Sequence, residues 1–155
     1  MSTTRLQCQI KAPRAQVYQA LIDPQAIAIW MVPDGMTSQV HTFEAREGGR
    51  FRISLTYVDP TTTGKSSEQT DTYHGHFVKL APDEQVIEVM AFETTNPTMQ
   101  GEMMVTFTLT DVDEGTALLA VHDQVPSGIA PADNELGWRM SLDKLAALVE
   151  GNRIQ

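Results

Sequence analysis

The sequence has 155 residues, of which 41% are hydrophobic and 20% are charged, and this composition is typical of one folded domain, which we place over residues 1–155. Its 20 acidic residues outnumber the 11 basic ones and give a net charge of −9. Such a surface repels phosphate groups, so we expect neither nucleic-acid binding nor membrane insertion. A single cysteine, Cys8, excludes an internal disulfide and a cysteine-based metal site, and we therefore expect a cytoplasmic protein.

The first predicted elements are a strand and two short helices. Residues 5–11 alternate between apolar and polar side chains, which predicts a half-buried strand. Pro13 stands where a helix begins, because a proline at the first helical position loses no hydrogen bond. Pro24 ends this helix and opens a second one, which we expect Asp23 to cap and which runs to about Trp30.

The middle of the chain predicts six strands. Residues typical of strands gather in the segments 40–45, 51–57, 72–80, 86–93, 103–109 and 116–123. Gly48 and Gly49 predict a tight turn between the first two strands, since glycine tolerates positive φ angles. Residues 59–70 are rich in Thr, Ser, Gly and Pro, which predicts a polar loop.

A long helix is predicted at the end of the chain. Either Asp133 or Asn134 caps its start, and Gly151 is placed at its end. Its large apolar residues fall on one face and form a single stripe, which consists of Trp138, Leu142, Leu145 and Val149.

This order of elements predicts an α+β fold. Consecutive strands favour an antiparallel meander, and a sheet of about seven strands is too wide to stay flat. We expect the sheet to curl around the C-terminal helix with its apolar face inside. Since the two short helices are too small to fill the space, the sequence predicts a cavity beneath the long helix.

Several sequence motifs, in this order along the chain, resemble those of a known family. The motifs are Ile10-Lys11-Ala12-Pro13, Val17 to Pro24, Trp30 to Pro33, Glu47 to Arg52, Tyr73-His74-Gly75-His76-Phe77, Leu80-Ala81-Pro82, Gly115-Thr116 and Gly137-Trp138. From about residue 5 to 150 the chain resembles the activator of heat-shock-protein-90 ATPase-like domains. These belong to the START-like (SRPBCC, birch-pollen-allergen-like) superfamily with the helix-grip fold.

The resemblance implies a cavity between the sheet and the long helix. It also implies a range of functions, which includes lipid and hormone carriers, polyketide cyclases and a eukaryotic co-chaperone, and it allows for a homodimer. Many relatives carry tryptophans in the strand after the proline turn, where this chain has Met90 and Phe92. We expect a methionine there to make the lining more deformable.

The leading hypothesis is a module that binds an apolar or amphipathic small molecule in this cavity. Apolar side chains supply affinity through buried area, and a few polar groups orient the guest. We assign the polar role to His76 and His122. The apolar lining is predicted to consist of Phe51, Ile53, Met90, Phe92, Val105, Phe107, Leu118, Trp138, Leu142 and Leu145.

Two other functions stay open at this stage. A cyclase or hydrolase would use the same cavity with His76 or His122 as general base, but the sequence assigns no catalytic residues. A protein-interaction module would bind a chaperone, by analogy with the co-chaperone, and would need an exposed patch that periodicity does not reveal.

The histidines also raise the question of a metal. His74 and His76 lie two residues apart on one strand and face one side, so that they could chelate zinc together with His122 or Glu88. The alternative is that they are polar strand residues bonded to neighbours or water. Because no cysteine or His-Glu motif supports a site, we predict no metal and no cofactor.

Overall fold

The computed structural model describes residues 1–58 and 70–154, with side chains up to Gly151. Its strands are β1 (Ser2–Ile10), β2 (Met36–Phe43), β3 (Arg50–Tyr57), β4 (Thr70–Ala81), β5 (Gln85–Phe92), β6 (Met103–Val112) and β7 (Gly115–Val125). Its helices are α1 (Arg14–Ile22), α2 (Pro24–Trp30), the 3-10 helix η1 (Pro97–Met99) and α3 (Pro131–Ile154). The predicted loop over 59–70 lies outside the described residues except for Thr70.

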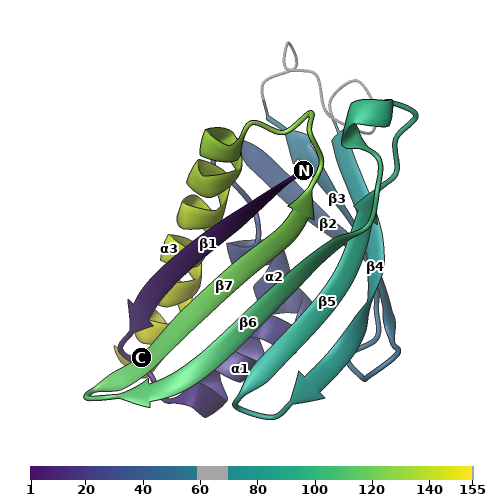
Figure 1. Ribbon diagram of the computed structural model, residues 1–155. Helices are drawn as coiled ribbons and strands as arrows, with labels where there is room; N and C mark the ends of the chain where they lie inside the picture. Colours follow the sequence, from purple (N-terminus) through teal and green to yellow (C-terminus); the bar gives the residue numbers. More distant parts are fainter. Residues whose placement is uncertain (59–69, 155) are drawn as a thin grey trace.

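The strands form one antiparallel sheet that bends around α3 (Figure 1). The seven strands follow the order β1-β7-β6-β5-β4-β3-β2, so that the first strand pairs with the last and the others form a meander. Helices α1 and α2 lie on the same inner side of the sheet as α3. This arrangement confirms the predicted α+β fold with a curved sheet and a C-terminal helix.

Gly75 in β4 shows why the sheet can bend closely at its centre. A Cβ atom at this position would collide with the Val89 carbonyl oxygen of β5 and would meet the ring of Phe51. The register of β4 against β5 also shifts between Phe77 and Lys79. A glycine and a register shift at neighbouring positions increase local twist, which turns the inner face of the sheet toward α3.

Alternation along the strands places one apolar set inside. Phe77 of β4 and Phe107 of β6 are at most 1% exposed, and the Phe77 and Phe51 ring centroids lie 5.3 Å apart. Trp30 at the end of α2 is fully buried, and its indole N–H donates to the Ala20 carbonyl at 2.8 Å. The two short helices therefore fill more of the interior than their length suggests.

Two local predictions for the C-terminal helix differ from the structure, and one for the β2–β3 turn agrees with it. Helix α3 begins at Pro131, and the Asn134 amide donates to the Ala130 carbonyl, so the prediction of a cap at Asp133 or Asn134 was wrong. Gly151 lies within the helix and does not end it. The β2–β3 connection spans residues 44–49 and contains the predicted tight turn, because the Gly49 amide donates to the Arg46 carbonyl at 2.8 Å and Gly48 takes a positive φ of 79°.

The predicted cap of α2 is confirmed, because the Asp23 carboxylate accepts the Gln25 amide at 2.9 Å. Among the described residues, none of the helices combines the length and the apolar character that a membrane crossing requires.

Candidate functional site

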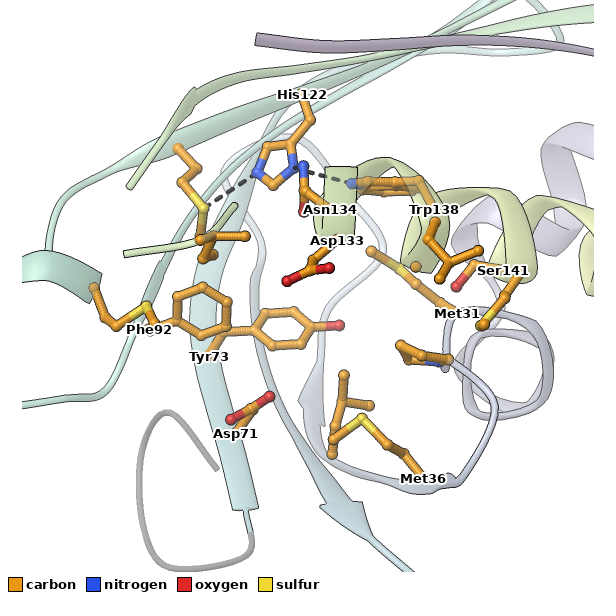
Figure 2. A pocket seen from close by; sticks show the side chains of 18 of the residues that line it. Met31, Met36, Asp71, Tyr73, Phe92, His122, Asp133, Asn134, Trp138 and Ser141 are labelled. Atoms are coloured by element: carbon orange, nitrogen blue, oxygen red, sulfur yellow. Dashed lines mark hydrogen bonds between the residues drawn. The ribbon is translucent and has the colours of Figure 1, made fainter. Parts of the chain in front are cut away.

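A cleft of about 620 Å³ lies between the N-terminal half of α3 and the inner face of the sheet (Figure 2). Its floor comes from the ends of β3, β4 and β5, and one wall comes from the first three turns of α3. The connection from α2 to β2, the η1 region and residues 128–130 complete its rim. We call this space the cleft and use the name only for it.

Methionines dominate the apolar lining of the cleft. Six of the eight methionines of the chain border it, namely Met31, Met36, Met90, Met99, Met103 and Met140. They come from separate elements, so the fold gathers them from distant parts of the sequence. Because a methionine side chain is unbranched and adapts its shape, such a lining can close around guests of different outline.

Aromatic side chains form the more rigid part of the lining. Tyr73 and Phe92 pack edge to face with ring centroids 6.4 Å apart, and Trp138 packs in the same manner on buried Phe107 at 5.8 Å. Gly137 precedes Trp138 in α3 and also borders the cleft. A Cβ atom at Gly137 would meet only Pro33, at 4.0 Å, so the missing side chain leaves space on this wall.

His122 of β7 contacts α3 through its Nδ1 and β6 through its Nε2 (Figure 2). Its Nδ1 accepts the Trp138 indole N–H at 2.9 Å and lies 3.1 Å from the Asn134 side-chain nitrogen. Its Nε2 lies 3.1 Å from the sulfur of Met103. The two donors at Nδ1 fix the neutral tautomer with its proton on Nε2. Burial lowers the pKa of His122 to about 4, so the ring is uncharged at neutral pH.

Tyr73 places a hydroxyl at the cleft without a partner. Its side chain is 5% exposed, and the hydroxyl has no hydrogen-bond partner in the described part of the chain. Burial, reinforced by the charge of Glu88, raises the pKa of this phenol, which therefore stays protonated. Figure 2 shows the ring extending across the cleft from β4. A buried hydroxyl of this kind is costly unless a guest or a structural change satisfies it.

Glu88 is a second buried polar group, deeper in the interior. It lies opposite Phe77 on β4 and Val105 on β6 and is 4% exposed. Burial raises the pKa of its carboxyl to about 8, so this group is largely protonated at neutral pH. Glu88 does not border the cleft.

The predicted lining residues fall into three groups. Met90, Phe92, His122 and Trp138 border the cleft. Seven others are at most 3% exposed and lie in the core: Phe51, Ile53, Val105, Phe107, Leu118, Leu142 and Leu145. His76 is exposed, because strand alternation turns it away from buried Phe77.

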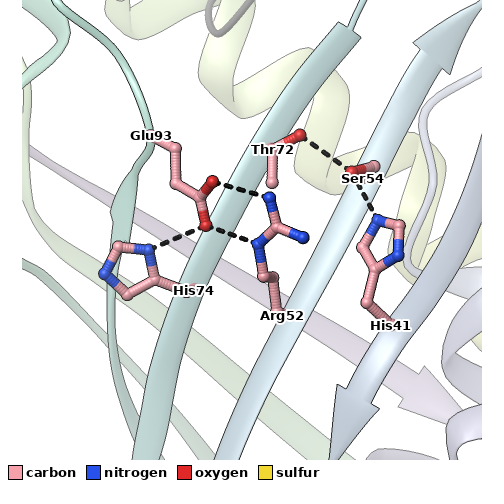
Figure 3. Close-up of polar contacts among 6 residues, drawn as sticks. All are labelled: His41, Arg52, Ser54, Thr72, His74 and Glu93. Carbon is pink, nitrogen blue, oxygen red and sulfur yellow. Dashed lines mark hydrogen bonds and ion pairs between the residues drawn. The ribbon is translucent and has the colours of Figure 1, made fainter.

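His41 and His74 lie on the outer face of the sheet (Figure 3). His74 Nδ1 lies 3.1 Å from Glu93, whose carboxylate also receives two hydrogen bonds from Arg52 at 2.8 and 2.9 Å. The bond from Arg52 lowers the pKa of Glu93 to about 2. His41 lies 2.8 Å from the Ser54 hydroxyl. These contacts form a polar surface network on neighbouring strands.

This placement separates the four groups considered for zinc. His74 and His76 are exposed on the outer face, whereas Glu88 and His122 are buried on the inner side. The sheet therefore keeps the two pairs apart. Within residues 1–58 and 70–151, no group of three or more potential ligands is close enough to hold a metal ion.

Sequence reasoning did not assign several residues that border the cleft. Tyr73 could have been found, because it alternates with Gly75 and Phe77 on the inward side of a predicted strand. Met31, Met36 and Met99 lie in or beside connecting segments, where no periodicity shows which way a side chain points. Only the folded chain brings them together.

The family model described as Activator of Hsp90 ATPase homolog 1-like protein matches residues 11–150. A search among curated proteins gives no match.

Solved structures give a consistent result. A protein from Chromobacterium violaceum is 33% identical, with a TM-score of 0.86 and coverage of 96% of both chains. A protein from Mesorhizobium loti is 22% identical, with a TM-score of 0.74 and coverage of 99% of both chains. An AHSA1-like protein from Aeromonas hydrophila is 17% identical, with a TM-score of 0.73 over 99% of this chain and 96% of that one. The last two show the shared fold alone. The chain therefore belongs to the family of Activator of Hsp90 ATPase homolog 1-like proteins.

Proposed function

We propose that the protein binds an apolar or amphipathic small molecule in the cleft. The observation that carries this proposal is a space of about 620 Å³ bordered by six methionines and several aromatic rings. Its size lies in the range of small-molecule sites, which combine a largely apolar lining with a few polar groups. The family's fold supports a ligand-binding role.

The cleft has apolar surface that a guest can cover, whereas the interior beside it is filled by side chains. The neighbouring interior is filled by side chains such as Phe107 and Leu145, which are at most 1% exposed. A guest that covers the methionines removes their apolar surface from water, and each Å² contributes roughly 25 cal/mol before the costs of association. The cleft is the part of the inner face where such surface remains to be covered.

Nile red, a neutral apolar dye, tests the proposal directly. We expect saturable fluorescence enhancement with a blue shift, displacement by decanol, and an upward shift of the thermal midpoint at excess dye, since a ligand that binds only the folded state stabilises it. Absence of saturable binding by this dye and by decanol would overturn the proposal.

A matched pair of variants locates the binding. Met140→Gln changes a residue of α3 that borders the cleft, whereas Met104→Gln makes the same change on an exposed strand residue that does not border it. We expect the first variant to weaken Nile red binding about fivefold and the second to leave it unchanged. Equal effects of the two variants would place the dye elsewhere.

The enzymatic alternative receives less support. The general-base role was assigned to His76 or His122, and His76 is exposed away from the cleft. Both ring nitrogens of His122 already contact protein atoms, so its lone pair is not available to take a proton from a substrate. A chaperone partner stays an alternative on the basis of the family alone.

A further inference from the structure

We propose that the cleft selects neutral or cationic amphipathic molecules and discriminates against anionic ones. This inference rests on the proposed function and names the class of guest. Three features support it: the charges that border the cleft, the unpartnered Tyr73 hydroxyl and the aromatic rings around it.

The charges around the cleft are of one sign. The ionisable residues that border it within the described ranges are Asp34, Asp71, Asp133, Tyr57, Tyr73 and His122. Neither lysine nor arginine is among these described lining residues. Tyr73 is protonated, and His122 is neutral because burial lowers its pKa to about 4. A carboxylate guest would therefore meet the Asp133 carboxylate and no lysine or arginine among the described lining residues.

Lys144 lies close to one rim and shows why it does not reverse this balance. Its ammonium group contacts the Asp34 carboxylate at 2.9 Å and donates to the Val32 carbonyl at 2.6 Å. Lys144 and Asp34 offset each other, and Asp133 in the first turn of α3 stays as an acidic group at the mouth.

Tyr73 supplies the group that orients a guest. Its hydroxyl is buried and unpartnered within the described chain, and Figure 2 shows Tyr73 and Asp133 both directed into the cleft from opposite walls. A phenol can donate one hydrogen bond and accept another, so an alcohol can satisfy both roles, whereas an ammonium group donates to the phenol oxygen only. A carboxylate could accept from the phenol, but it would lie in the field of the aspartates.

The aromatic rings favour a cation further. Tyr73, Phe92 and Trp138 border the cleft, and their faces carry negative electrostatic potential. An ammonium group near a ring face is attracted to it, most strongly where water is excluded. An amphipathic amine thus finds apolar contacts for its body. Its ammonium group finds an acidic side chain, the phenol oxygen of Tyr73 and the aromatic ring faces.

Three probes with the same apolar body separate these possibilities: naphthylethylamine, naphthylethanol and naphthylacetate. Measured by calorimetry at pH 7, the amine and the alcohol should bind at least about tenfold more tightly than the acetate. One outcome is that the protein binds Nile red in the separate dye titration, but naphthylacetate binds as tightly as the amine. In that case the selectivity is refuted and the proposed function stands. If neither Nile red nor any of the probes binds, both proposals fail.

Two variants test the named groups. Tyr73→Phe should lower the affinity for naphthylethanol about fivefold relative to ethylnaphthalene, which has no hydroxyl. Asp133→Asn should narrow the amine-to-acetate preference about threefold. Asp113→Asn makes the same charge change in the exposed β6–β7 turn, away from the cleft, and should leave the preference unchanged. An equal effect of Asp113→Asn would assign the selectivity to net charge and contradict the site.

Discussion

The two halves of the interior differ in the side chains that occupy them. Toward α1 and α2, the inner face of the sheet is covered by branched and aromatic residues such as Phe77, Trp30 and Leu145, none of them measurably exposed. Toward the start of α3, methionines border a cleft of about 620 Å³. Rigid side chains fill the first half to the density of a crystal, while adaptable ones line the half that stays unfilled. The half near α1 and α2 therefore stabilises the fold, whereas the half that holds the cleft has space for a small molecule.

The largest effect should come from matched truncations of one aromatic residue in each half. Phe77→Ala removes a ring that packs on Phe43 and Phe51, and we expect a loss of about 3–5 kcal/mol in the free energy of unfolding. Phe92→Ala, at the cleft, should cost about half as much, since its half-buried ring borders existing space. Urea denaturation measures both, and equal losses would remove the distinction between the halves.

The buried carboxyl of Glu88 should make the stability of the filled half fall as the pH rises from about 4.5 to about 8. The folded pKa is about 8 against an ordinary value of 4.5, so between these values the folded state retains a proton that the unfolded state has lost. The free energy of unfolding therefore falls as the pH rises through this window. Glu88→Gln should stabilise the protein by on the order of 3 kcal/mol at pH 7 and flatten this limb.

Glu102→Gln is the control for Glu88→Gln, because Glu102 is exposed at the start of β6. It should change neither the stability nor its pH dependence. If the stability of Glu88→Gln falls between pH 4.5 and 8 as steeply as that of the original protein, Glu88 is ionised in the folded protein and the prediction is contradicted.

His122 should make the cleft half sensitive to acid. Its folded pKa of about 4 lies below the ordinary 6.5, so the unfolded state takes up a proton first as the pH falls. The contribution of His122 to stability is complete above about pH 6.5, and its loss amounts to on the order of 3 kcal/mol on reaching pH 4. Because Glu88 has the opposite effect over the same range, the comparison is made in the Glu88→Gln background. With exposed His76→Gln as control, denaturation should show the loss in the control and a smaller loss in His122→Gln. An equal acid limb in both variants would exclude His122 as its source.

A smaller effect is expected at the Tyr73 hydroxyl in the absence of guest. Because this hydroxyl is buried without a partner, Tyr73→Phe should raise the free energy of unfolding by about 1 kcal/mol. Tyr57→Phe, at a half-buried residue that also borders the cleft, should change it little. Thermal and urea unfolding of the empty proteins measure the difference. A destabilised Tyr73→Phe variant would mean that the hydroxyl is satisfied in solution.

The fold was largely predictable because the periodicity of two in the strands is a local property. The alternation in β3 and β6 identified Phe51 and Phe107 as inward residues, and the structure buries both. The sequence did not predict which of the inward residues border the cleft, because their surroundings depend on how the helices pack against the sheet. Leu142 and Leu145 share one core cluster with Trp30, since α2 fills the space predicted to be empty there.

The polar residues show the same limit. His122 borders the cleft as predicted, but its bonds to Trp138 and Asn134 join elements that are separate in sequence, and no local pattern indicates them. The exposed position of His76 follows from the register of β4 once Phe77 is placed inward. The alternation of inward and outward residues in this strand would therefore have predicted that His76 points outward.

The most direct test of the binding account is to fill the cleft. Gly137→Leu adds a side chain to the wall of α3 where a Cβ would meet only Pro33, and Gly151→Leu adds the same side chain to the same helix where a Cβ would meet nothing. Replacing glycine within a helix should keep both variants as stable as the original protein. The account predicts that Gly137→Leu reduces Nile red affinity at least about tenfold while Gly151→Leu retains it. A folded Gly137→Leu variant that binds the dye with undiminished affinity would contradict the account.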